Sequence, residues 1–272
     1  MSESVRIREV GPRDGFQNEP EVITTEHKVE LIDALARTGL KRLELTSFVR
    51  ADVIPQLADA GDVLARVNVP ADVSISVLIP NERGLDAALE QREQIDEVNV
   101  FLSASETHNR HNVNRSIEES LSGLERVLAR ALAEGLRCEG VISTSFGCPY
   151  EGHVPPVRVL EIAAREALGD ELELTAHFHN TRGQGLANVL AALEAGVDSF
   201  ESSFGELGGC PVPAGATGNI ATEDLVSMLH EMGIATGIDR AALLACARRA
   251  QEILGRPLGS HTLVAGPVEW QH

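Results

Sequence analysis

Short apolar or β-branched runs alternate with longer runs of helical period along almost the whole chain, and this alternation restricts the possible folds more than any other feature. Strands are expected at residues 5–10, 42–48, 73–80, 97–105, 138–146, 172–179 and 199–204. Repeated βα units are typical of a parallel sheet. Because polar motifs follow these runs directly, we expect an α/β fold of the (β/α) TIM-barrel type, with its active site at the carboxyl ends of the strands. A doubly wound open sheet is the alternative.

Two helices have clear start signals. Apolar residues recur at helical spacing over residues 25–38, with Thr24 or Thr25 as a candidate N-cap and Gly39 as a stop. The longest helical run begins near Ser116, with acidic residues in its first turn.

One barrel unit is missing from the pattern. Seven βα units are recognisable, and only a turn lies between residues 168 and 172, where another strand and helix would be expected. The 272 residues contain no low-complexity linker, so we expect residues 1–272 to form a single domain.

Composition excludes several classes of function. A net charge of -18 repels a polyanion, and the scattered Lys and Arg residues form no basic stripe, so nucleic acid is not an expected partner. The charged first ten residues lack the apolar core of a secretion signal, and no run of 18 apolar residues occurs, so we expect no membrane association and a cytoplasmic location. The four cysteines form no C-x-x-C pair.

His177 and His179 stand two residues apart on an expected strand. Their side chains therefore project from one face, about 6–7 Å apart. Two imidazoles placed in this way can bind one metal ion, and the alternative is a pair of histidines hydrogen-bonded in a polar barrel mouth.

Asp14 follows the first expected strand directly. A carboxylate there offers the hard oxygen ligand that Mg²⁺ or Mn²⁺ prefers. The sequence Pro-Arg-Asp-Gly is also good turn chemistry, which is the competing interpretation.

A glycine- and proline-rich loop follows the last strand over residues 205–219. Cys210 in this loop is either a packed small residue or a thiol brought to the substrate by loop closure. Asn219 could cap the helix that starts near Ala221 or direct its amide oxygen to a metal.

Polar residues on the second strand complete the candidate set. Glu44 is an acid expected inside the barrel, where it needs a partner, and Arg13 is the nearest candidate. Ser47 lies on the opposite face of that strand, and Asn112 follows the fourth strand.

Six motifs resemble one known family. EVGPRDGFQNE, LELTSFV, SIEES, GCPYEG, AHFHNTRGQGLANVLAALEAGV and LGGCPVPAGATGNIATEDLV occur in the order found in 3-hydroxy-3-methylglutaryl-CoA (HMG-CoA) lyases, which are TIM-barrel metallolyases, and the match runs from about residue 5 to residue 260. The resemblance implies a carbon–carbon lyase that cleaves HMG-CoA to acetyl-CoA and acetoacetate in leucine degradation.

The same resemblance implies roles for individual residues. Mg²⁺ or Mn²⁺ would be bound by Asp14, His177, His179 and Asn219. Arg13 would stabilise the enolate, Cys210 would shuttle a proton, and Glu44 joins the catalytic set together with Asp14 and His177. Arg13, Gln17, Ser47 and Asn112 would contact the acyl-CoA substrate.

The chain also departs from the family. Roughly one βα unit of about 30 residues is absent after Leu168, together with the Asp that its strand normally carries. Either the flanking strands pair directly or a second chain fills the slot, as in a homodimer. Asn180 replaces the usual Asp, and Glu206 stands where Gly is commoner. The alternative functions are a catalytically weak or inactive homologue that binds CoA and metal, and a lyase for another branched hydroxyacyl-CoA.

Overall fold

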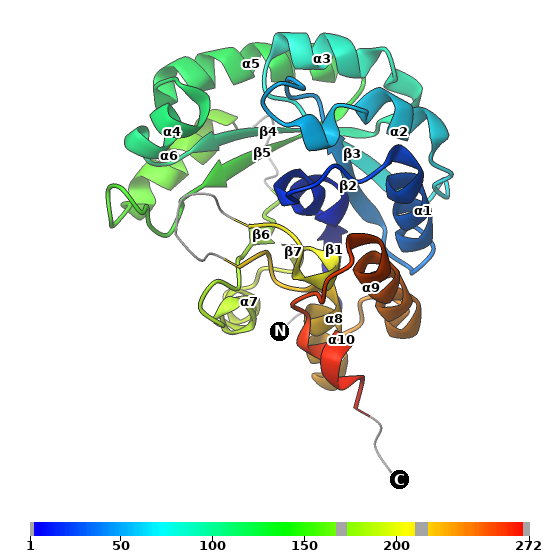
Figure 1. The fold of residues 1–272 in the computed structure, drawn as a ribbon. Helices are drawn as coiled ribbons and strands as arrows, with labels where there is room; N and C mark the ends of the chain where they lie inside the picture. The colour runs from blue at the N-terminus through cyan, green and yellow to red at the C-terminus, as the bar shows by residue number, and fades with distance from the viewer. Residues whose placement is uncertain (1–2, 167–172, 210–216, 269–272) are drawn as a thin grey trace. The chain divides into compact units, whose positions relative to one another are not determined.

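The computed structural model describes residues 3–166, 173–209 and 217–268, and these ranges contain seven strands that pair in parallel (Figure 1). The strands are β1 (Arg6–Glu9), β2 (Arg42–Ser47), β3 (Ser74–Leu78), β4 (Glu97–Ser103), β5 (Arg137–Ser143), β6 (Ala176–His177) and β7 (Ser199–Ser202). The helices are α1 (Thr25–Leu35), α2 (Ala60–Arg66), α3 (Glu82–Leu89), α4 (Glu106–Val113), α5 (Ile117–Ala133), α6 (Pro156–Glu166), α7 (Gly185–Glu194), α8 (Thr222–Glu231), α9 (Arg240–Leu254) and α10 (His261–Ala265).

The chain divides into two compact units. Unit 1 comprises residues 1–46, 51–75 and 174–272, and unit 2 comprises residues 47–50 and 76–173. The strand order is β2-β1-β7-β6 within unit 1 and β3-β4-β5 within unit 2. A single domain over residues 1–272 stays a prediction.

The register of unit 1 aligns the strand ends that carry the candidate residues. β1 pairs with β7 from Arg6 opposite Ser199 to Glu9 opposite Ser202, and β6 pairs with β7 through His177 opposite Glu201. Because these strands are parallel and adjacent, the segments that leave their carboxyl ends lie next to one another. This arrangement brings residues from the two ends of the sequence into one site.

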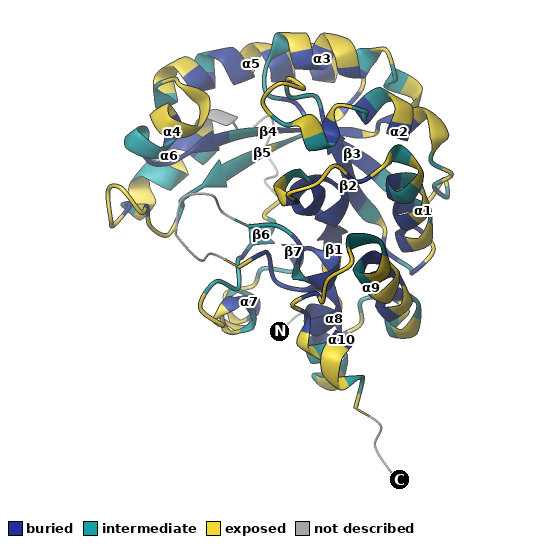
Figure 2. Ribbon diagram, in the orientation of Figure 1, coloured by how far each residue is buried: buried dark blue, intermediate teal, exposed yellow. Residues whose placement is uncertain are grey.

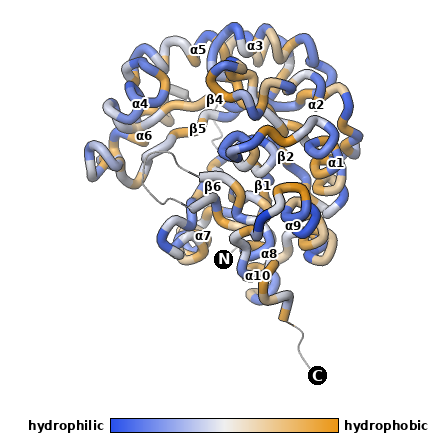
Figure 3. The backbone as a smooth tube through the Cα atoms, viewed as in Figure 1, coloured by the Kyte–Doolittle hydropathy of each residue, from blue (hydrophilic) through white to orange (hydrophobic). Residues whose placement is uncertain are grey.

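Unit 2 is built around β4 and the long helix α5. β4 pairs with β5 from Glu97 opposite Arg137 to Ser103 opposite Ser143. Ser116 and Glu119 form a reciprocal capping box at the start of α5, as the sequence predicted near Ser116. Hydrophobic and hydrophilic residues alternate along α5 (Figure 3), and its apolar face is buried through Leu121, Leu124, Val127, Leu128 and Ala131.

The first helix begins and ends where the sequence indicated. Thr24 is the N-cap of α1, since its hydroxyl accepts a hydrogen bond from the backbone N–H of His27. Gly39 has a φ of 98°, and a Cβ at this position would lie 2.1 Å from the carbonyl oxygen of Gly237, so only glycine fits this turn.

The strand expected at residues 172–179 is shorter in the structure than the sequence predicted. Among the described residues of this segment, only Ala176 and His177 form the ladder with β7, and Leu174 is 61% exposed. Alternating apolar residues extend further, but the extent of a strand is set by the backbone groups that its neighbour offers. His179 instead forms an isolated bridge with Asn219.

The connection from α6 to β6 agrees with the predicted absence of one βα unit. Only residues 167–175 separate the two elements, which is too short for a further strand and helix. β5, the last strand in the order of unit 2, is only partly buried, whereas β4 beside it is almost entirely buried (Figure 2).

Among the described residues, no helix combines the length and the apolar character needed to cross a membrane.

Candidate metal centre

Asp14 lies in a helical turn, Gly11–Gly15, that follows β1 directly. Its carboxylate is buried and accepts hydrogen bonds at both oxygens. Oδ1 accepts from Arg13 Nη1 at 2.6 Å and from Gln17 Nε2 at 2.7 Å, and Oδ2 accepts from Asn219 Nδ2 at 2.8 Å. The turn and ligand interpretations are therefore compatible, because the turn directs the carboxylate inward.

His177 and His179 face each other. Their Nε2 atoms are 3.1 Å apart, and His177 Nδ1 lies 2.7 Å from Glu201 Oε2. The carboxylate of Glu201 favours a proton on Nδ1 of His177, which leaves Nε2 to face the cluster.

Asn219 provides the test of whether a metal fits. Its side chain is fully buried, and Nδ2 donates to Asp14 and to the carbonyl oxygen of Leu207, at 2.8 and 3.2 Å. Its Oδ1 has no hydrogen-bond partner within the described ranges. A buried amide oxygen without a partner is costly unless a ligand occupies it. The N-cap of α8 is Ala221, so Asn219 does not cap that helix.

The cluster as a whole has the donor set of a divalent cation site. One ligand atom each from Asp14, His177 and His179 lies within 4.8 Å of the others, and the orphaned oxygen of Asn219 belongs to the side chain that holds Asp14. Carboxylate and amide oxygens together with imidazole nitrogens suit a divalent ion of the first transition row or Mg²⁺.

Electrostatics prepare Asp14 and His179 for a cation. Burial acts to raise the pKa of Asp14, but Arg13, His177, the hydrogen bond from Asn219 and His179 outweigh it, so its pKa lies below the ordinary value. Burial, together with the neighbouring His177, lowers the pKa of His179 to about 4. Burial also acts to lower the pKa of His177, yet Glu201 raises it above its ordinary value. Asp14 is thus ionised and His179 is neutral, as ligands must be.

Arg13 is fixed beside the cluster, and its expected pairing with Glu44 is confirmed. Its Nε donates to Glu44 Oε2 at 2.6 Å, and Glu44 on β2 is fully buried. Burial acts to lower the pKa of Arg13, but Glu44 and Asp14 raise it well above its ordinary value. The guanidinium is a permanent positive charge adjacent to the candidate ligands.

Arg8 and Glu201 are site residues that the sequence reasoning missed. Arg8 Nη1 donates to Glu201 Oε1 at 3.1 Å, and the opposite oxygen of Glu201 binds His177. Burial acts to raise the pKa of Glu201, but His177 and Arg8 lower it to about 2. A signal was available, because Arg8 and Glu201 lie in the middle of strands expected to be buried, where a charge requires a partner.

Of the remaining predicted residues, one contacts the cluster. Gln17 binds Asp14 directly. Ser47, at the end of β2, is buried, and its hydroxyl has no hydrogen-bond partner in the described part of the chain. Asn112 is exposed on α4 in unit 2. Cys210 lies outside the described residues.

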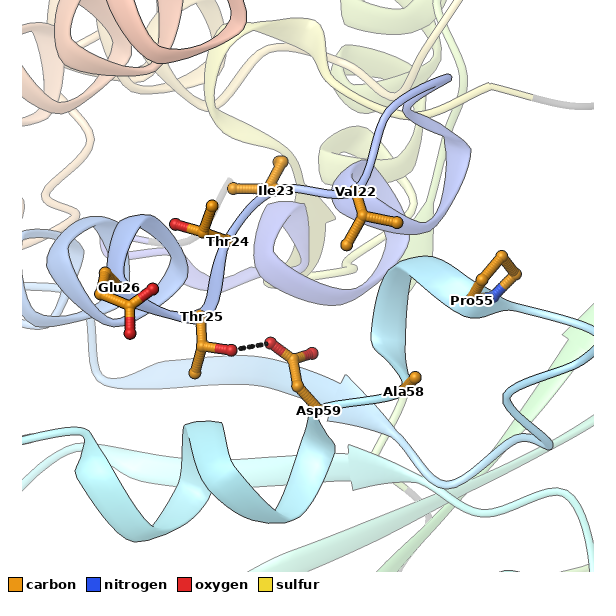
Figure 4. A pocket seen from close by; sticks show the side chains of 8 residues that line it. All are labelled: Val22, Ile23, Thr24, Thr25, Glu26, Pro55, Ala58 and Asp59. Atoms are coloured by element: carbon orange, nitrogen blue, oxygen red, sulfur yellow. Dashed lines mark hydrogen bonds between the residues drawn. The ribbon is translucent and has the colours of Figure 1, made fainter.

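A separate pocket of about 280 Å³ lies at the start of α1 (Figure 4). It is lined by residues 22–26 together with Pro55, Ala58 and Asp59, and Thr25 donates a hydrogen bond to Asp59 across it. None of the predicted site residues lines this pocket.

Comparison with known proteins identifies the family. The HMGL-like family profile matches residues 4–167 and 163–249. The hydroxymethylglutaryl-CoA lyase of Bacillus subtilis is 43% identical over 289 aligned positions, which cover 95% of this chain and 96% of the relative. The chain belongs to the HMG-CoA lyase family.

Solved structures of HMG-CoA lyases share its fold. The crystal structure of the Bacillus subtilis enzyme superposes with a TM-score of 0.92 at 41% identity, covering 97% of this chain and 98% of that one. The Acinetobacter baumannii enzyme, in complex with coenzyme A and 3-methylmalate, gives a TM-score of 0.91 at 35% identity and covers 100% and 99%. The fold is therefore α/β of the TIM type, as predicted.

The family match also locates the missing unit. The profile matches in two segments that overlap over residues 163–167, and the alignment with the Bacillus subtilis enzyme is longer than the 272 residues of this chain. The relative therefore contains residues without a counterpart here, and the overlap of the two segments lies next to the gap that the sequence pattern indicated between residues 168 and 172.

Proposed function

We propose that this protein is an HMG-CoA lyase that cleaves HMG-CoA to acetyl-CoA and acetoacetate. The observation that carries the proposal is the convergence of one ligand atom each from Asp14, His177 and His179, beside Asn219, whose buried side-chain oxygen has no partner among the described residues, in a chain that belongs to this family. The cleavage removes the proton of the tertiary hydroxyl and breaks the bond between the carbinol carbon and the carbon next to the thioester. The carbinol becomes the ketone of acetoacetate, and the thioester enolate gains a proton to give acetyl-CoA.

Asp14, His177, His179 and Asn219 would hold the cofactor, for which we propose Mg²⁺ or Mn²⁺. When bound, such an ion lowers the pKa of a coordinated hydroxyl and orients the substrate oxygens. Gln17 keeps Asp14 in position from one side and Asn219 does so from the other. Glu201 fixes the imidazole of His177 through Nδ1, so that Nε2 points at the cluster.

Arg13 would stabilise the negative charge that develops on the enolate. Its Nε and Nη1 atoms are occupied by Glu44 and Asp14, so the guanidinium plane is fixed before substrate arrives. A pre-oriented cation in a buried site stabilises developing charge without reorganisation. Glu44 acts as a positioning residue in this scheme, and Cys210 would return the proton to the enolate carbon.

Substrate contacts are proposed for Gln17, Ser47 and Asn112 in addition to Arg13. The hydroxyl of Ser47, buried and without a hydrogen-bond partner among the described residues, supports its assignment. The relative bound to coenzyme A supports an acyl-CoA partner. A cytoplasmic location, a role in leucine degradation and assembly as a homodimer remain proposals from the sequence.

The test is metal-dependent product formation. Protein freed of metal with a chelator should release acetyl-CoA from HMG-CoA only after Mg²⁺ or Mn²⁺ is added, and the two ions should be compared at matched concentrations. Folded, metal-loaded protein that forms no acetyl-CoA would overturn the proposal. Longer branched hydroxyacyl-CoA thioesters, assayed in parallel, decide the substrate alternative.

A second candidate, a homologue that binds CoA and metal without turnover, is favoured by one observation. The chain lacks a βα unit, and only residues 167–175 connect α6 to β6. Calorimetry that detects binding of HMG-CoA in the presence of metal, with no acetyl-CoA formed, would support this candidate.

A further inference from the structure

Glu206 has an unusual backbone conformation for its residue type. It lies in the turn Phe204–Glu206 after β7, with a φ of 61°. Left-handed backbone costs free energy for any residue with a Cβ, and a glutamate persists there only where its surroundings compensate.

The carboxylate of Glu206 joins two segments that are distant in sequence. Its Oε1 accepts a hydrogen bond from Asn180 Nδ2 at 2.8 Å, and Asn180 Oδ1 accepts one from the backbone N–H of Gly185 at 3.1 Å. Its Oε2 packs against Gly259, where an added Cβ would lie only 2.0 Å away. Asn180 directly follows His179, so this hydrogen bond acts on the segment that carries a candidate metal ligand.

The backbone of the same turn contacts the segment that carries Asn219. The carbonyl of Glu206 lies so close to Gly218 that a Cβ there would be 2.1 Å from its oxygen. Asn219 Nδ2 donates to the carbonyl of Leu207, and the backbone N–H of Asn180 donates to the carbonyl of Gly218 at 3.1 Å. The turn, the His179 segment and the Asn219 segment thus form a closed set of contacts.

From this geometry we infer that Glu206 is a positioning residue for the metal centre, which tethers the His179 segment through Asn180 and keeps His179 in register with Asn219. The inference rests on the proposed function, because it assigns a role toward the metal that the centre would bind.

The folding of the turn itself does not depend on the Glu206 carboxylate. The backbone N–H of Gly205 is bound by both carboxylate oxygens of Glu223 at 3.0 Å, and the N–H of Phe204 is bound by Glu9 at 3.0 and 3.1 Å. The side chain of Glu206 can therefore be removed while these anchors stay in place. Metal affinity and global stability are then separable.

The test is calorimetric titration of the metal-free protein with Mn²⁺ alone, together with thermal unfolding. Glu206→Gly releases the tether and also relieves the left-handed backbone, so its Tm should equal or exceed that of the wild type. Its Kd for Mn²⁺ should rise by about tenfold, the lower end of the range for residues that orient metal ligands. Glu206→Gln retains an oxygen acceptor for Asn180 and should bind Mn²⁺ within about twofold of the wild type.

A charge exchange tests the hydrogen bond itself. Asn180→Asp alone places a second carboxylate 2.8 Å from Glu206 and should weaken Mn²⁺ binding by at least as much as Glu206→Gly does. Adding Glu206→Gln restores the hydrogen bond with its roles reversed, because the amide at position 206 then donates to the carboxylate at position 180. This double variant should recover most of the lost Mn²⁺ affinity. Asn114→Gly is the matched control, because Asn114 also has a positive φ, of 55°, but caps α4 outside the metal centre.

Three results would overturn the inference. If Glu206→Gly binds Mn²⁺ as the wild type does, the tether has no effect on the centre. If Tm and Mn²⁺ affinity fall together, Glu206 is merely structural. If the wild type itself does not bind Mn²⁺, the metal centre of the proposed function fails and this inference fails with it.

Discussion

β7 and β5 belong to the same kind of parallel sheet, yet their surroundings differ. β7 lies between β1 and β6 in unit 1, and all four of its residues are buried. β5 is the last strand in the order of unit 2, and its residues are exposed or only partly buried (Figure 2). The missing βα unit falls after β5 and α6, whereas the candidate ligands belong to unit 1. A truncation of the barrel pattern can therefore leave a candidate metal centre in place when its residues belong to other parts of the sheet.

The two regions also differ in how deeply their ion pairs are buried. Near β7, the buried charges form hydrogen-bonded pairs, Arg8 with Glu201 and Arg13 with Glu44. On unit 2, the ion pairs of Arg126 with Glu82 and Arg130 with Asp86 are largely exposed. Exposed pairs are worth little, whereas breaking a buried pair is costly. Substitutions in the two regions should therefore differ in magnitude.

The largest effect is expected for Asp14→Ala. It removes a ligand and the acceptor of Arg13, Gln17 and Asn219 together. Turnover of HMG-CoA should fall by about 10³-fold, as for the loss of a major electrostatic group, and Mn²⁺ binding should be lost. Acetyl-CoA release and calorimetry measure the two quantities, and near-normal turnover would show that the reaction does not use this centre.

The second largest effect is expected for Glu201→Gln. It replaces the carboxylate that pairs with the fully buried Arg8 by a neutral amide, and breaking a buried pair costs about 3–5 kcal/mol. It also weakens the orientation of His177, so Kd for Mn²⁺ should rise about 10- to 100-fold. Urea unfolding and metal titration of one preparation measure both effects. Unchanged metal affinity would exclude Glu201 as the orienting group.

Stability should depend on pH through Glu223. Burial raises the pKa of the Glu223 carboxyl from 4.5 to about 8, although the hydrogen bonds that this carboxyl accepts act to lower it. The native state then holds a proton that the unfolded chain has released, so the free energy of unfolding should decline as pH rises from about 5 to 8. Urea unfolding across this range should show the slope, and Glu223→Gln should reduce it. An equal slope in the variant would assign the dependence to other groups.

The smallest effect is expected for Leu160→Lys on α6, since Leu160 is 68% exposed. The free energy of unfolding should change by less than about 0.5 kcal/mol. Leu124→Ala on the buried face of α5 is the contrast within unit 2 and should cost about 2–5 kcal/mol. A large loss for Leu160→Lys, or a change in oligomeric state by light scattering, would show that another chain covers α6.

The sequence by itself determined the order and kind of the elements. Period and capping predicted α1 and α5, and alternation predicted the seven strands, because these signals depend on residues close together in the chain. The same local pattern exposed the missing unit between residues 168 and 172. Asp14, His177 and His179 could also be predicted as candidate metal ligands from the nearby sequence, since each follows or lies on a recognisable strand.

Only the tertiary structure decided how these residues act together. Asn219 could have capped a helix, but the N-cap of α8 is Ala221, and Asn219 is instead buried against Asp14, 205 positions away in the chain. The ladder between β6 and β7 set the true length of the strand that carries His177 and placed Glu201 beside it. A buried charge can find its partner on any strand that the fold places beside it. The local sequence pattern therefore indicates that a partner is needed, but the register of the sheet decides which residue it is.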